Sequence, residues 1–403
     1  MIRPLVIAHD FLMLNSSGGQ VERPFWENMA DKHHYSPTIF CSDKGSKDLM
    51  CSYIDFKLIH EIRFIKYAAA IVRRILPDLT FLPDYEYVSW GRRAAHVAIK
   101  IAEQERFDYI HSISFPSSDH WCALKIKKAS GLPWIAQFHD PWYDNPFRRF
   151  KTKCLKKKDM EMEKQVVENA DIIIHNNDAI KELWRQRYGE DIVKKIVVIP
   201  LNVGFKSEHV VVNPRKIEGK LTITHIGNFY YMRKSAEFIK AVSVFVNQYP
   251  DMADKVQVFY LGNIMDEDKN LISKLHLTNI FHLLGKVPEE ICYDYYRNSD
   301  VFLATAGLFN ENIFFPSKIL KYFYYQKPIF GITPKGTVLY HELKKSGHES
   351  FEINDESGMV NYLYRAVSDY PSLYVFNKDY WKFFSIDSVL DAYTRTVDKL
   401  LAK

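Results

Sequence analysis

Hydrophobic positions fall into short, nearly continuous apolar runs, separated by longer stretches with helical spacing. In the first half the runs are PLVIAHD (4–10), SPTIFCSD (36–43), YIHSIS (109–114), WIAQFHD (134–140), DIIIHNN (171–177) and IVVIPLN (196–202). In the second half they are LTITHIGN (221–228), VQVFYLGN (256–263), IFHLLGK (280–286), DVFLAT (300–305), PIFGIT (328–333) and ESFEIN (349–354). Such runs are typical of parallel strands that helices cover on both faces.

The stretches between these runs carry helix signals. Residues 120–131, HWCALKIKKASG, end on Gly131 before Leu-Pro, which is a stop signal. After the first run, apolar residues recur every four positions at Val21, Phe25 and Met29. A closing helix is indicated by the spacing of Val389, Tyr393, Val397 and Leu400. Strand–helix alternation twice over predicts an α/β fold with two doubly wound parallel sheets.

The chain length supports two domains, because one hydrophobic core rarely grows beyond about 250–300 residues and this chain has 403. We expect an N-terminal domain over 1–203, a second domain over 204–375 and a closing segment over 376–403 that packs back on the first domain. The aperiodic polar stretch 204–220 is the linker candidate. Two such domains are expected to face each other across a cleft, with ligands at the carboxyl ends of the strands.

Composition excludes several classes of protein. A net charge of +5 with a pI near 8.6 is too weak, without a clustered patch, to indicate nucleic-acid binding. Five scattered cysteines without a C-x-x-C pair fit reduced thiols. The first apolar run is too short for a signal peptide, and no stretch approaches the roughly 18 apolar residues of a membrane span. We expect a cytoplasmic protein.

Glycines and a histidine follow strands of the first half. Gly18 and Gly19 come after the first strand and open a helix, where bare backbone and free amides favour a bound anion. A flexible turn before a helix explains the same residues. His139 follows the strand WIAQF, where an imidazole can bond a sugar hydroxyl or be satisfied by a neighbouring carbonyl.

Two strand ends of the second half carry cations. Arg233 and Lys234 are expected to open the helix that follows Gly227, a position that disfavours cations unless an anion lies there. Pro316-Ser317-Lys318 is expected to start another helix, with Ser317 as its cap and Lys318 as part of an anion site. No P-loop, G-x-G-x-x-G or zinc spacing occurs. Acids 266–268 are expected to complement a helix dipole rather than bind a metal.

Together these segments resemble GT-B fold glycosyltransferases of the retaining "glycosyl transferases group 1 / family 4-like" type. The resemblance spans nearly the whole chain. The segments that carry it are SSGGQVER, WIAQFHDPW, IVVIPLNV, HIGNFYYMRKSAEFIKAV, HLLGKVPEEICYDYYRNSDVFLAT and FPSKILKYFYYQKPIFGI. The last two are the most specific, whereas the glycine loop alone is not.

The resemblance implies roles for individual residues. His139 would contact the donor sugar, and Arg233 and Lys318 would neutralise the departing diphosphate, so that no metal or cofactor is needed. The donor would be UDP- or GDP-linked. Its other contacts would be Gly18, Gly19, Asn228, Gly285, Lys286, Val287, Glu311, Asn312 and Ser317.

One position departs from the family pattern. Many members carry two glutamates eight positions apart, and the positions that match here are Ile313 and Lys321. Glu311 replaces the first glutamate, or the motif has drifted. This departure sustains an alternative, a non-catalytic GT-B scaffold or chaperone for a partner transferase. A GT-B epimerase acting on UDP-N-acetylglucosamine has no support beyond the fold.

Two basic segments suggest an anionic membrane surface and a glycan or lipid-diphosphate acceptor. In 58–76 the apolar face is expected to comprise Leu58, Ile62, Ile65, Ala69, Val72 and Leu76, with arginines and lysines elsewhere. Segment 147–158 holds seven Lys or Arg residues. A core-facing helix and a solvated loop explain both equally. The resulting expectation is a hexosyltransferase of bacterial-type surface polysaccharide or lipopolysaccharide synthesis, cytoplasmic or peripheral at the inner face of the plasma membrane.

Overall fold

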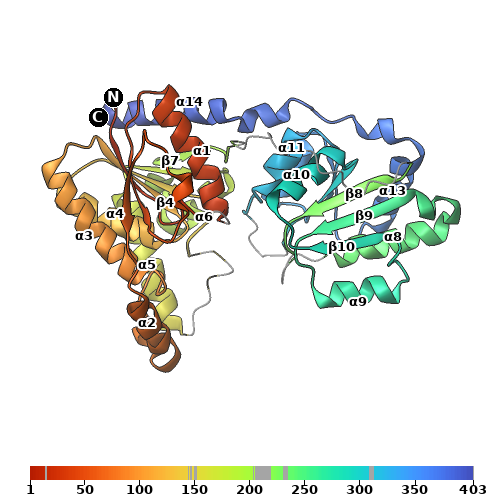
Figure 1. Ribbon diagram of the computed structural model, residues 1–403, viewed down its shortest axis with the longest axis horizontal. Coiled ribbons are helices and arrows are strands. Elements are labelled where there is room, and N and C mark those ends of the chain that lie inside the picture. The colour runs from red at the N-terminus through yellow and green to blue at the C-terminus, as the bar shows by residue number, and fades with distance from the viewer. Residues whose placement is uncertain are drawn as a thin grey trace. The chain divides into compact units, whose positions relative to one another are not determined.

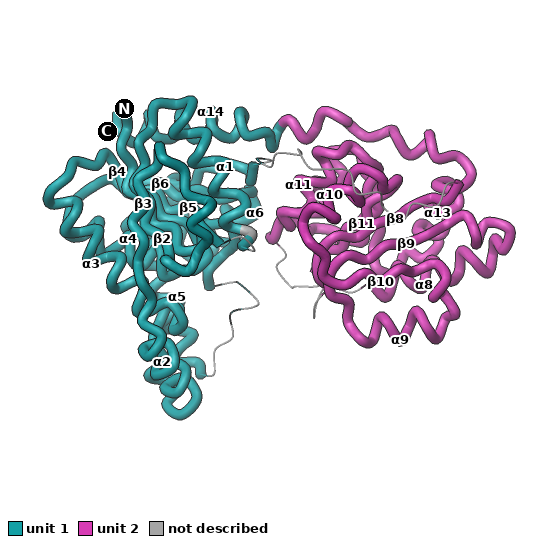
Figure 2. Tube along the Cα trace, viewed as in Figure 1, with its two compact units in different colours: residues 1–205, 383–403 teal, residues 206–382 magenta. Residues whose placement is uncertain are grey.

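The computed structural model describes residues 1–13, 16–143, 145, 148, 152–202, 204, 219–229, 235–307 and 313–402. The chain forms two compact units (Figure 2). Unit 1 comprises residues 1–205 and 383–403, and unit 2 comprises residues 206–382. The segment expected to close the chain, 376–403, is therefore divided between the units. Of the expected linker 204–220, only residues 204, 219 and 220 lie within the described part.

Unit 1 is built on a seven-stranded parallel sheet with the order β3-β2-β1-β4-β5-β6-β7. Its strands are β1 (Pro4–Ile7), β2 (Thr38–Ser42), β3 (Asp55–Ile59), β4 (Tyr109–Ser114), β5 (Trp134–Phe138), β6 (Ile172–His175) and β7 (Ile196–Val198). Its α-helices are α1 (Ser17–Lys32), α2 (Arg63–Ile75), α3 (Val88–Gln104), α4 (Ser118–Ser130), α5 (Lys153–Asn169), α6 (Ala179–Tyr188), α7 (Glu190–Val193) and α14 (Ile386–Leu401). The short 3₁₀ helices η1 (Lys47–Leu49) and η2 (Pro77–Leu79) complete it, with the end of η5 (Tyr380–Phe384).

Helices cover both faces of the unit 1 sheet, as continuously apolar strands require. On one face α1 and α14 share a core with the sheet, and both chain ends lie beside it (Figure 1). On the other face Phe138 of β5 packs against His120 of α4 and Trp184 of α6. The residues expected to face the core from α1 and α14 are all buried: Val21, Phe25, Met29, Val389, Tyr393, Val397 and Leu400.

Unit 2 repeats this plan with six parallel strands in the order β10-β9-β8-β11-β12-β13. The strands are β8 (Leu221–Ile226), β9 (Val256–Leu261), β10 (Phe281–Gly285), β11 (Val301–Thr305), β12 (Ile329–Ile332) and β13 (Glu349–Phe351). The helices are α8 (Ala236–Gln248), α9 (Asp266–Lys274), α10 (Glu289–Asn298), α11 (Lys318–Tyr324), α12 (Val338–Lys345) and α13 (Glu356–Ser368), with 3₁₀ turns η3 (Pro250–Lys255) and η4 (Tyr370–Leu373).

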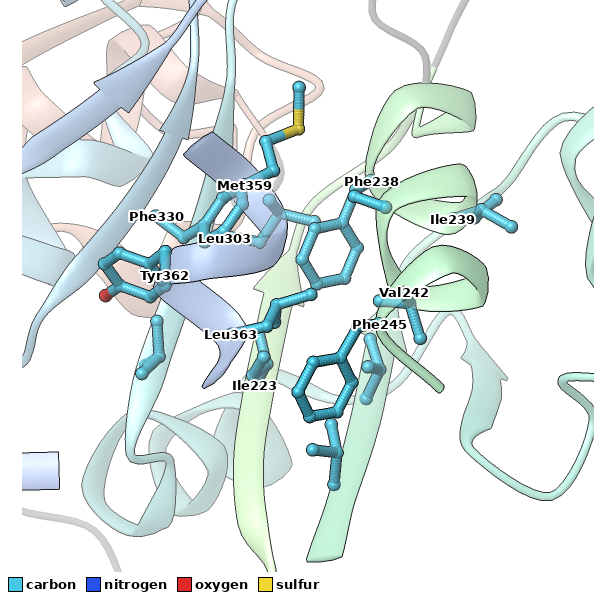
Figure 3. Packing of buried hydrophobic residues seen from close by; sticks show 14 of the residues in the cluster. Ile223, Phe238, Ile239, Val242, Phe245, Leu303, Phe330, Met359, Tyr362 and Leu363 are labelled. Carbon is cyan, nitrogen blue, oxygen red and sulfur yellow. The ribbon is translucent and has the colours of Figure 1, made fainter. Parts of the chain in front are cut away.

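The unit 2 core lies between the sheet and the pair α8 and α13. Phe238 and Phe245 of α8 meet Tyr362 and Leu363 of α13 over Ile223 of β8 (Figure 3). On the opposite face Phe302 of β11 stacks on Tyr322 of α11, with ring centroids 4.3 Å apart. The two faces of the unit 2 sheet therefore pack on different helices. Each unit has a hydrophobic core of its own.

The strand predictions were confirmed at all twelve apolar runs, but β3 was missed. Its sequence, DFKLI, is partly exposed at the edge of the sheet and has no continuous apolar run. The expected amphipathic helix over 58–76 was therefore wrong at its start, because Leu58 belongs to β3 and α2 begins at Arg63. Leu76, expected on the same apolar face as Ala69, is 52% exposed, whereas Ala69 is buried.

Candidate functional site

Strand order reverses once in each sheet, between β1 and β4 in unit 1 and between β8 and β11 in unit 2. In open α/β sheets, ligands bind outside the carboxyl ends of the strands at such a reversal. The segments after β8 and β11 contain half of the predicted site residues, and Gly285, Lys286 and Val287 lie at the end of β10 and directly after it. The segments after β1 and β5 contain the others, Gly18, Gly19 and His139.

Three glycines end neighbouring strands of unit 2. Gly227, Gly262 and Gly285 follow or end β8, β9 and β10 with φ angles of +124°, +118° and +66°. The Gly262 amide donates to the Gly285 carbonyl oxygen at 2.6 Å, and a Cβ on Gly262 would lie 2.5 Å from the carbonyl oxygen of Gly227. The strand ends therefore approach more closely than side chains would permit.

Lys318 lies beside this group of glycines. Its Nζ is 2.8 Å from Nε2 of His225, and a Cβ on Gly227 would lie 3.4 Å from the same Nζ. His225 is fully buried, and its Nδ1 donates to the Leu303 carbonyl oxygen at 2.9 Å. That bond leaves Nε2 as the acceptor, so a neutral imidazole holds the Lys318 ammonium group. Phe229 stacks on the imidazole with centroids 3.9 Å apart.

The other residues of unit 2 that were predicted to contact the donor differ in their surroundings, and three of them lie outside the described residues. Ser317 occupies the N-cap position of α11, as expected, but its side chain makes no capping hydrogen bond. The Asn228 side-chain oxygen accepts from the Asn263 amide at 2.9 Å and joins the segments after β8 and β9. Lys286 and Val287 connect β10 to α10, with the Lys286 side chain exposed. Arg233, Glu311 and Asn312 lie outside the described residues; helix α8 begins at Ala236.

Lys321, which stands where related enzymes often have glutamate, forms an ion pair with Glu289. Its Nζ is 3.0 Å from the Glu289 carboxylate, which also accepts from the Tyr293 hydroxyl at 3.0 Å. The ammonium group also lies 5.2 Å from the Tyr293 ring centroid. The carboxylate beside this position of α11 is therefore that of Glu289, in the first turn of α10.

In unit 1, His139 forms a pair with Glu22, a residue that the sequence reasoning did not select. Glu22 lies on α1, one turn after the glycines, and its Oε1 is 2.7 Å from His139 Nε2. The Gln137 amide donates to the same oxygen at 2.8 Å. Burial lowers the pKa of His139, but the Glu22 hydrogen bond and the charges of Glu22 and Asp140 outweigh it, so the pKa is raised. The pair favours an imidazolium.

Gly18 and Gly19 lie in the first turn of α1, and their surroundings differ. A Cβ on Gly19 would lie 2.7 Å from the Asp10 carbonyl oxygen and 2.9 Å from that of Met13. Among the described residues, a Cβ on Gly18 would meet only the Ser16 hydroxyl, at 3.5 Å. Gly19 is therefore required by packing, whereas no described atom lies closer than that hydroxyl to a Cβ on Gly18.

A cavity of about 300 Å³ opens beside Asp140, the residue after His139. Its walls combine aromatic rings, Tyr85, Tyr87, Phe115 and Trp142, with charged groups. Arg148, part of the basic segment expected at a membrane surface or in a solvated loop, is instead half-buried and bonds Asp84 at 2.6 Å and Asp159 at 2.5 Å. Residues 147, 149, 150 and 151 of that expected segment lie outside the described part.

Neither candidate site contains a group of metal-ligating side chains. Among the described residues, no three His, Cys, Asp or Glu side chains are arranged to hold a metal ion. Asp268, one of the early helix acids, instead accepts hydrogen bonds from the Ser235 amide and hydroxyl. The described part of the chain also has no helix with the length and hydrophobicity needed to cross a membrane.

The comparison with protein families gives one match. Residues 55–203 match the model of Glycosyltransferase Family 4. The match covers much of unit 1, and the expectation that the chain is a glycosyltransferase is confirmed at this level. No curated protein matches the sequence.

Solved structures match over the full length of both units. Sucrose-phosphate synthase from Thermosynechococcus elongatus is 12% identical, with a TM-score of 0.68 and complete coverage of both chains. Anabaena HepE, solved with UDP-glucose, is 12% identical with a TM-score of 0.68, covering 99% of this chain and 100% of its own. The lipopolysaccharide galactosyltransferase WaaB is 14% identical, with a TM-score of 0.63 and 99% coverage of each chain. The expected GT-B class, two Rossmann-like parallel-sheet domains, is thereby confirmed.

Proposed function

We propose that this glycosyltransferase moves a hexose from a UDP- or GDP-linked donor to a glycan or lipid-linked acceptor in surface polysaccharide or lipopolysaccharide synthesis. The observation that carries the proposal is the Lys318 ammonium group, held by a neutral imidazole beside Gly227 at the strand reversal of unit 2. UDP-glucose bound to HepE and the activity of WaaB, both similar in fold, support this choice of donor and pathway.

In the proposed reaction, charge grows on the diphosphate as the bond between sugar and phosphate breaks. Lys318 supplies a fixed positive charge that stabilises the leaving diphosphate. His225 orients the ammonium group of Lys318, and because the imidazole is neutral it does not compete with the diphosphate for this cation. Arg233 is proposed as a second cation from the sequence alone. We further propose that transfer retains the anomeric configuration and needs no metal.

Unit 1 is proposed to bind the acceptor and to contact the sugar. The cavity beside Asp140 offers aromatic rings, against which the apolar faces of sugars pack, together with charged groups that can bond hydroxyls. His139, whose pKa is raised by Glu22, is proposed to donate a hydrogen bond to a hydroxyl of the transferred sugar. Gly18, where a Cβ would meet only one hydroxyl among the described residues, is proposed to let substrate approach the N-terminus of α1.

A panel of nucleotide sugars tests the proposal. Purified protein should slowly hydrolyse one UDP- or GDP-sugar in the absence of acceptor, and that donor should raise the melting temperature of unit 2. The alternative of a non-catalytic scaffold rests on the Lys321–Glu289 pair, which replaces the glutamate of related enzymes. Neither hydrolysis nor a melting shift with any donor would favour that alternative and contradict the enzyme.

A further inference from the structure

Helix α2 exposes an apolar stripe on the face turned away from unit 1. The side chains of Phe64, Tyr67, Ile71 and Ile75 are 79%, 69%, 58% and 68% exposed. They are spaced by three or four positions and so lie along one side of the helix. Leu79, in the adjoining turn η2, continues the stripe and is 63% exposed. Monomeric proteins seldom leave so many large apolar side chains together in water.

This outer stripe is different from the apolar face expected from the sequence, for which an anionic membrane surface and the core were equal alternatives. Ile65 and Val72 are half-buried and Ala69 is fully buried, so the predicted face already packs on unit 1. Helix α2 is thus apolar on two sides, and its inner side is sufficient to hold it in place. The outer stripe has no role in folding the unit.

Positive charge borders the stripe. Arg63 and Arg74 precede Phe64 and Ile75 directly and lie about 100° further round the helix, along one edge of the stripe. Lys66 is exposed nearby, and none of these three cations has an ion-pair partner among the described residues. Helix α2 contains no acidic residue.

The start of helix α5 adds to this positive surface. Thr152, its N-cap, donates to the Asp78 carboxylate of η2 at 2.6 Å, and Lys158 reaches the Asp78 carbonyl oxygen at 3.4 Å. Lys153, Lys156 and Lys157 of the same helix are exposed. Figure 1 shows α2 at one extremity of unit 1, beyond the body of the sheet.

The geometry points to an anionic lipid bilayer as the occupant of this surface, with the stripe of α2 and η2 inserted at the level of the headgroups. An amphipathic helix whose apolar side chains enter the acyl boundary while Arg and Lys meet anionic headgroups is the usual interfacial arrangement. A tyrosine in the stripe suits that boundary, because its ring is apolar and its hydroxyl is polar.

A second copy of the chain fits this surface less well. In a two-fold dimer the same patch meets itself, so the arginines of both copies would be brought together without acids to balance them. An interfacial helix also needs no concave partner, which suits a convex helix with a 79%-exposed phenylalanine. This inference deepens the membrane and lipid-linked acceptor part of the proposed function, but binding is measured without turnover.

Flotation of the full-length protein with lipid vesicles tests the inference. Wild-type protein should float with vesicles of phosphatidylcholine and phosphatidylglycerol, and much less with phosphatidylcholine alone. The double variant Ile71→Glu and Ile75→Glu should bind at least about tenfold more weakly, because two inserting side chains are replaced by anions. Val375→Glu is the matched control, since Val375 is 84% exposed in unit 2, and it should bind like wild type.

Two further measurements separate the other occupants. Arg63→Gln with Arg74→Gln should reduce the dependence of binding on phosphatidylglycerol while the melting temperature stays unchanged. Wild-type flotation by the Ile71→Glu, Ile75→Glu variant would overturn the inference. A wild-type dimer that this variant dissociates would overturn it in favour of a second copy. Donor hydrolysis needs no lipid and should be unchanged in the variant, so loss of docking and loss of the proposed enzyme activity are distinguishable.

Discussion

At the scale of single residues, Lys318 should be the most sensitive charged side chain of unit 2. Under the proposed function, replacing it with alanine removes a preorganised charge from the departing diphosphate, and loss of one such group typically lowers kcat by about 10²–10³. Turnover of the nucleotide sugar by wild type and Lys318→Ala measures this. Melting should fall modestly, because the buried Nε2 of His225 loses its Lys318 donor, and an unpaired buried acceptor typically costs about 1–3 kcal/mol.

Lys286→Ala is the matched control for this prediction. Lys286 also follows a strand end of unit 2, but its side chain is exposed. Removing this side chain should leave turnover within about twofold of the wild-type rate. Surface substitutions rarely change the free energy of unfolding by more than about 0.5 kcal/mol, so the variant should remain folded. Equal losses of turnover in both variants would mean that the reaction depends on the overall positive charge of unit 2 and not on the fixed position of the Lys318 ammonium group.

The Glu22–His139 pair makes stability depend on pH. Because Glu22 helps to raise the pKa of His139 above its ordinary value of 6.5, the pair stabilises unit 1 fully below that value. The stabilisation is lost as the pH rises through the folded-state pKa. The free energy of unfolding should therefore differ more between wild type and Glu22→Gln at about pH 6 than at alkaline pH.

Denaturant titrations at several pH values measure this difference. Asp31→Asn on the same helix is the control, because Asp31 is exposed and its removal should give a difference that varies little with pH. A wild-type to Glu22→Gln difference that grows with pH would show that His139 is neutral in the folded state.

His139 and Lys318 could be selected from the sequence because each follows an apolar run that ends in a recognisable pattern. Their partners could not. Glu22 lies 117 positions before His139, and His225 lies 93 positions before Lys318. Only the sheet order brings these segments together, and a hydrogen-bond partner leaves no local periodicity. His225, buried within an apolar strand, is indistinguishable in sequence from a core histidine.

At the scale of elements, the two glycines of α1 should respond differently to the same substitution. Gly19→Ala places a Cβ within 3.0 Å of two backbone oxygens, and such overpacking typically costs about 1–3 kcal/mol. Gly18→Ala meets only a hydroxyl at 3.5 Å and replaces glycine with a better helix former, so it should preserve or slightly raise stability. Thermal unfolding of both variants measures the difference.

Activity then separates packing from substrate approach. If Gly18→Ala folds like wild type but loses turnover, the absence of a side chain at Gly18 is needed by the substrate. Full activity of Gly18→Ala would remove that residue from the proposed site and leave Gly19 as a purely structural glycine.

The elements themselves were predictable where one physical pattern dominates. Central parallel strands are buried on both faces, so β1, β4, β5, β8 and β11 appear as continuous apolar runs. Edge strand β3 is buried on one side only, and its Asp and Lys conceal it. Helix α2 has apolar residues on two sides, and periodicity alone cannot decide which side meets the core.

At the scale of the whole molecule, separate cores imply two folding units that respond to ligands separately. The donor contacts proposed in unit 2 predict that UDP raises the melting temperature of unit 2. A concentration of 100 times Kd should contribute about 2.7 kcal/mol to the unit that binds it. Calorimetry with and without UDP should show one shifted transition. A shift confined to the unit 1 transition would contradict the prediction, because it would mean that UDP binds unit 1.

The chain returns to unit 1 after completing unit 2, so the folding of unit 1 should depend on its last helix. Helix α14 buries Val389, Leu390, Tyr393, Val397 and Leu400, each at most 3% exposed. Burial of each contributes about 1.5–3 kcal/mol, and the sum is comparable to the 5–15 kcal/mol stability of a typical domain. The Tyr393 hydroxyl also bonds the hydroxyl of Tyr109 and His111 Nδ1, at 2.9 Å each.

A chain that ends at Lys382 should therefore keep a folded unit 2 and lose cooperative unfolding of unit 1. Tryptophan fluorescence reports this directly, because every tryptophan except Trp381 belongs to unit 1. Removal of residues 402–403 alone, which leaves α14 intact, should preserve the wild-type emission. Native-like emission from the chain ending at Lys382 would show that the sheet of unit 1 is sufficient without α14, because the helix would then cover a core that is already stable.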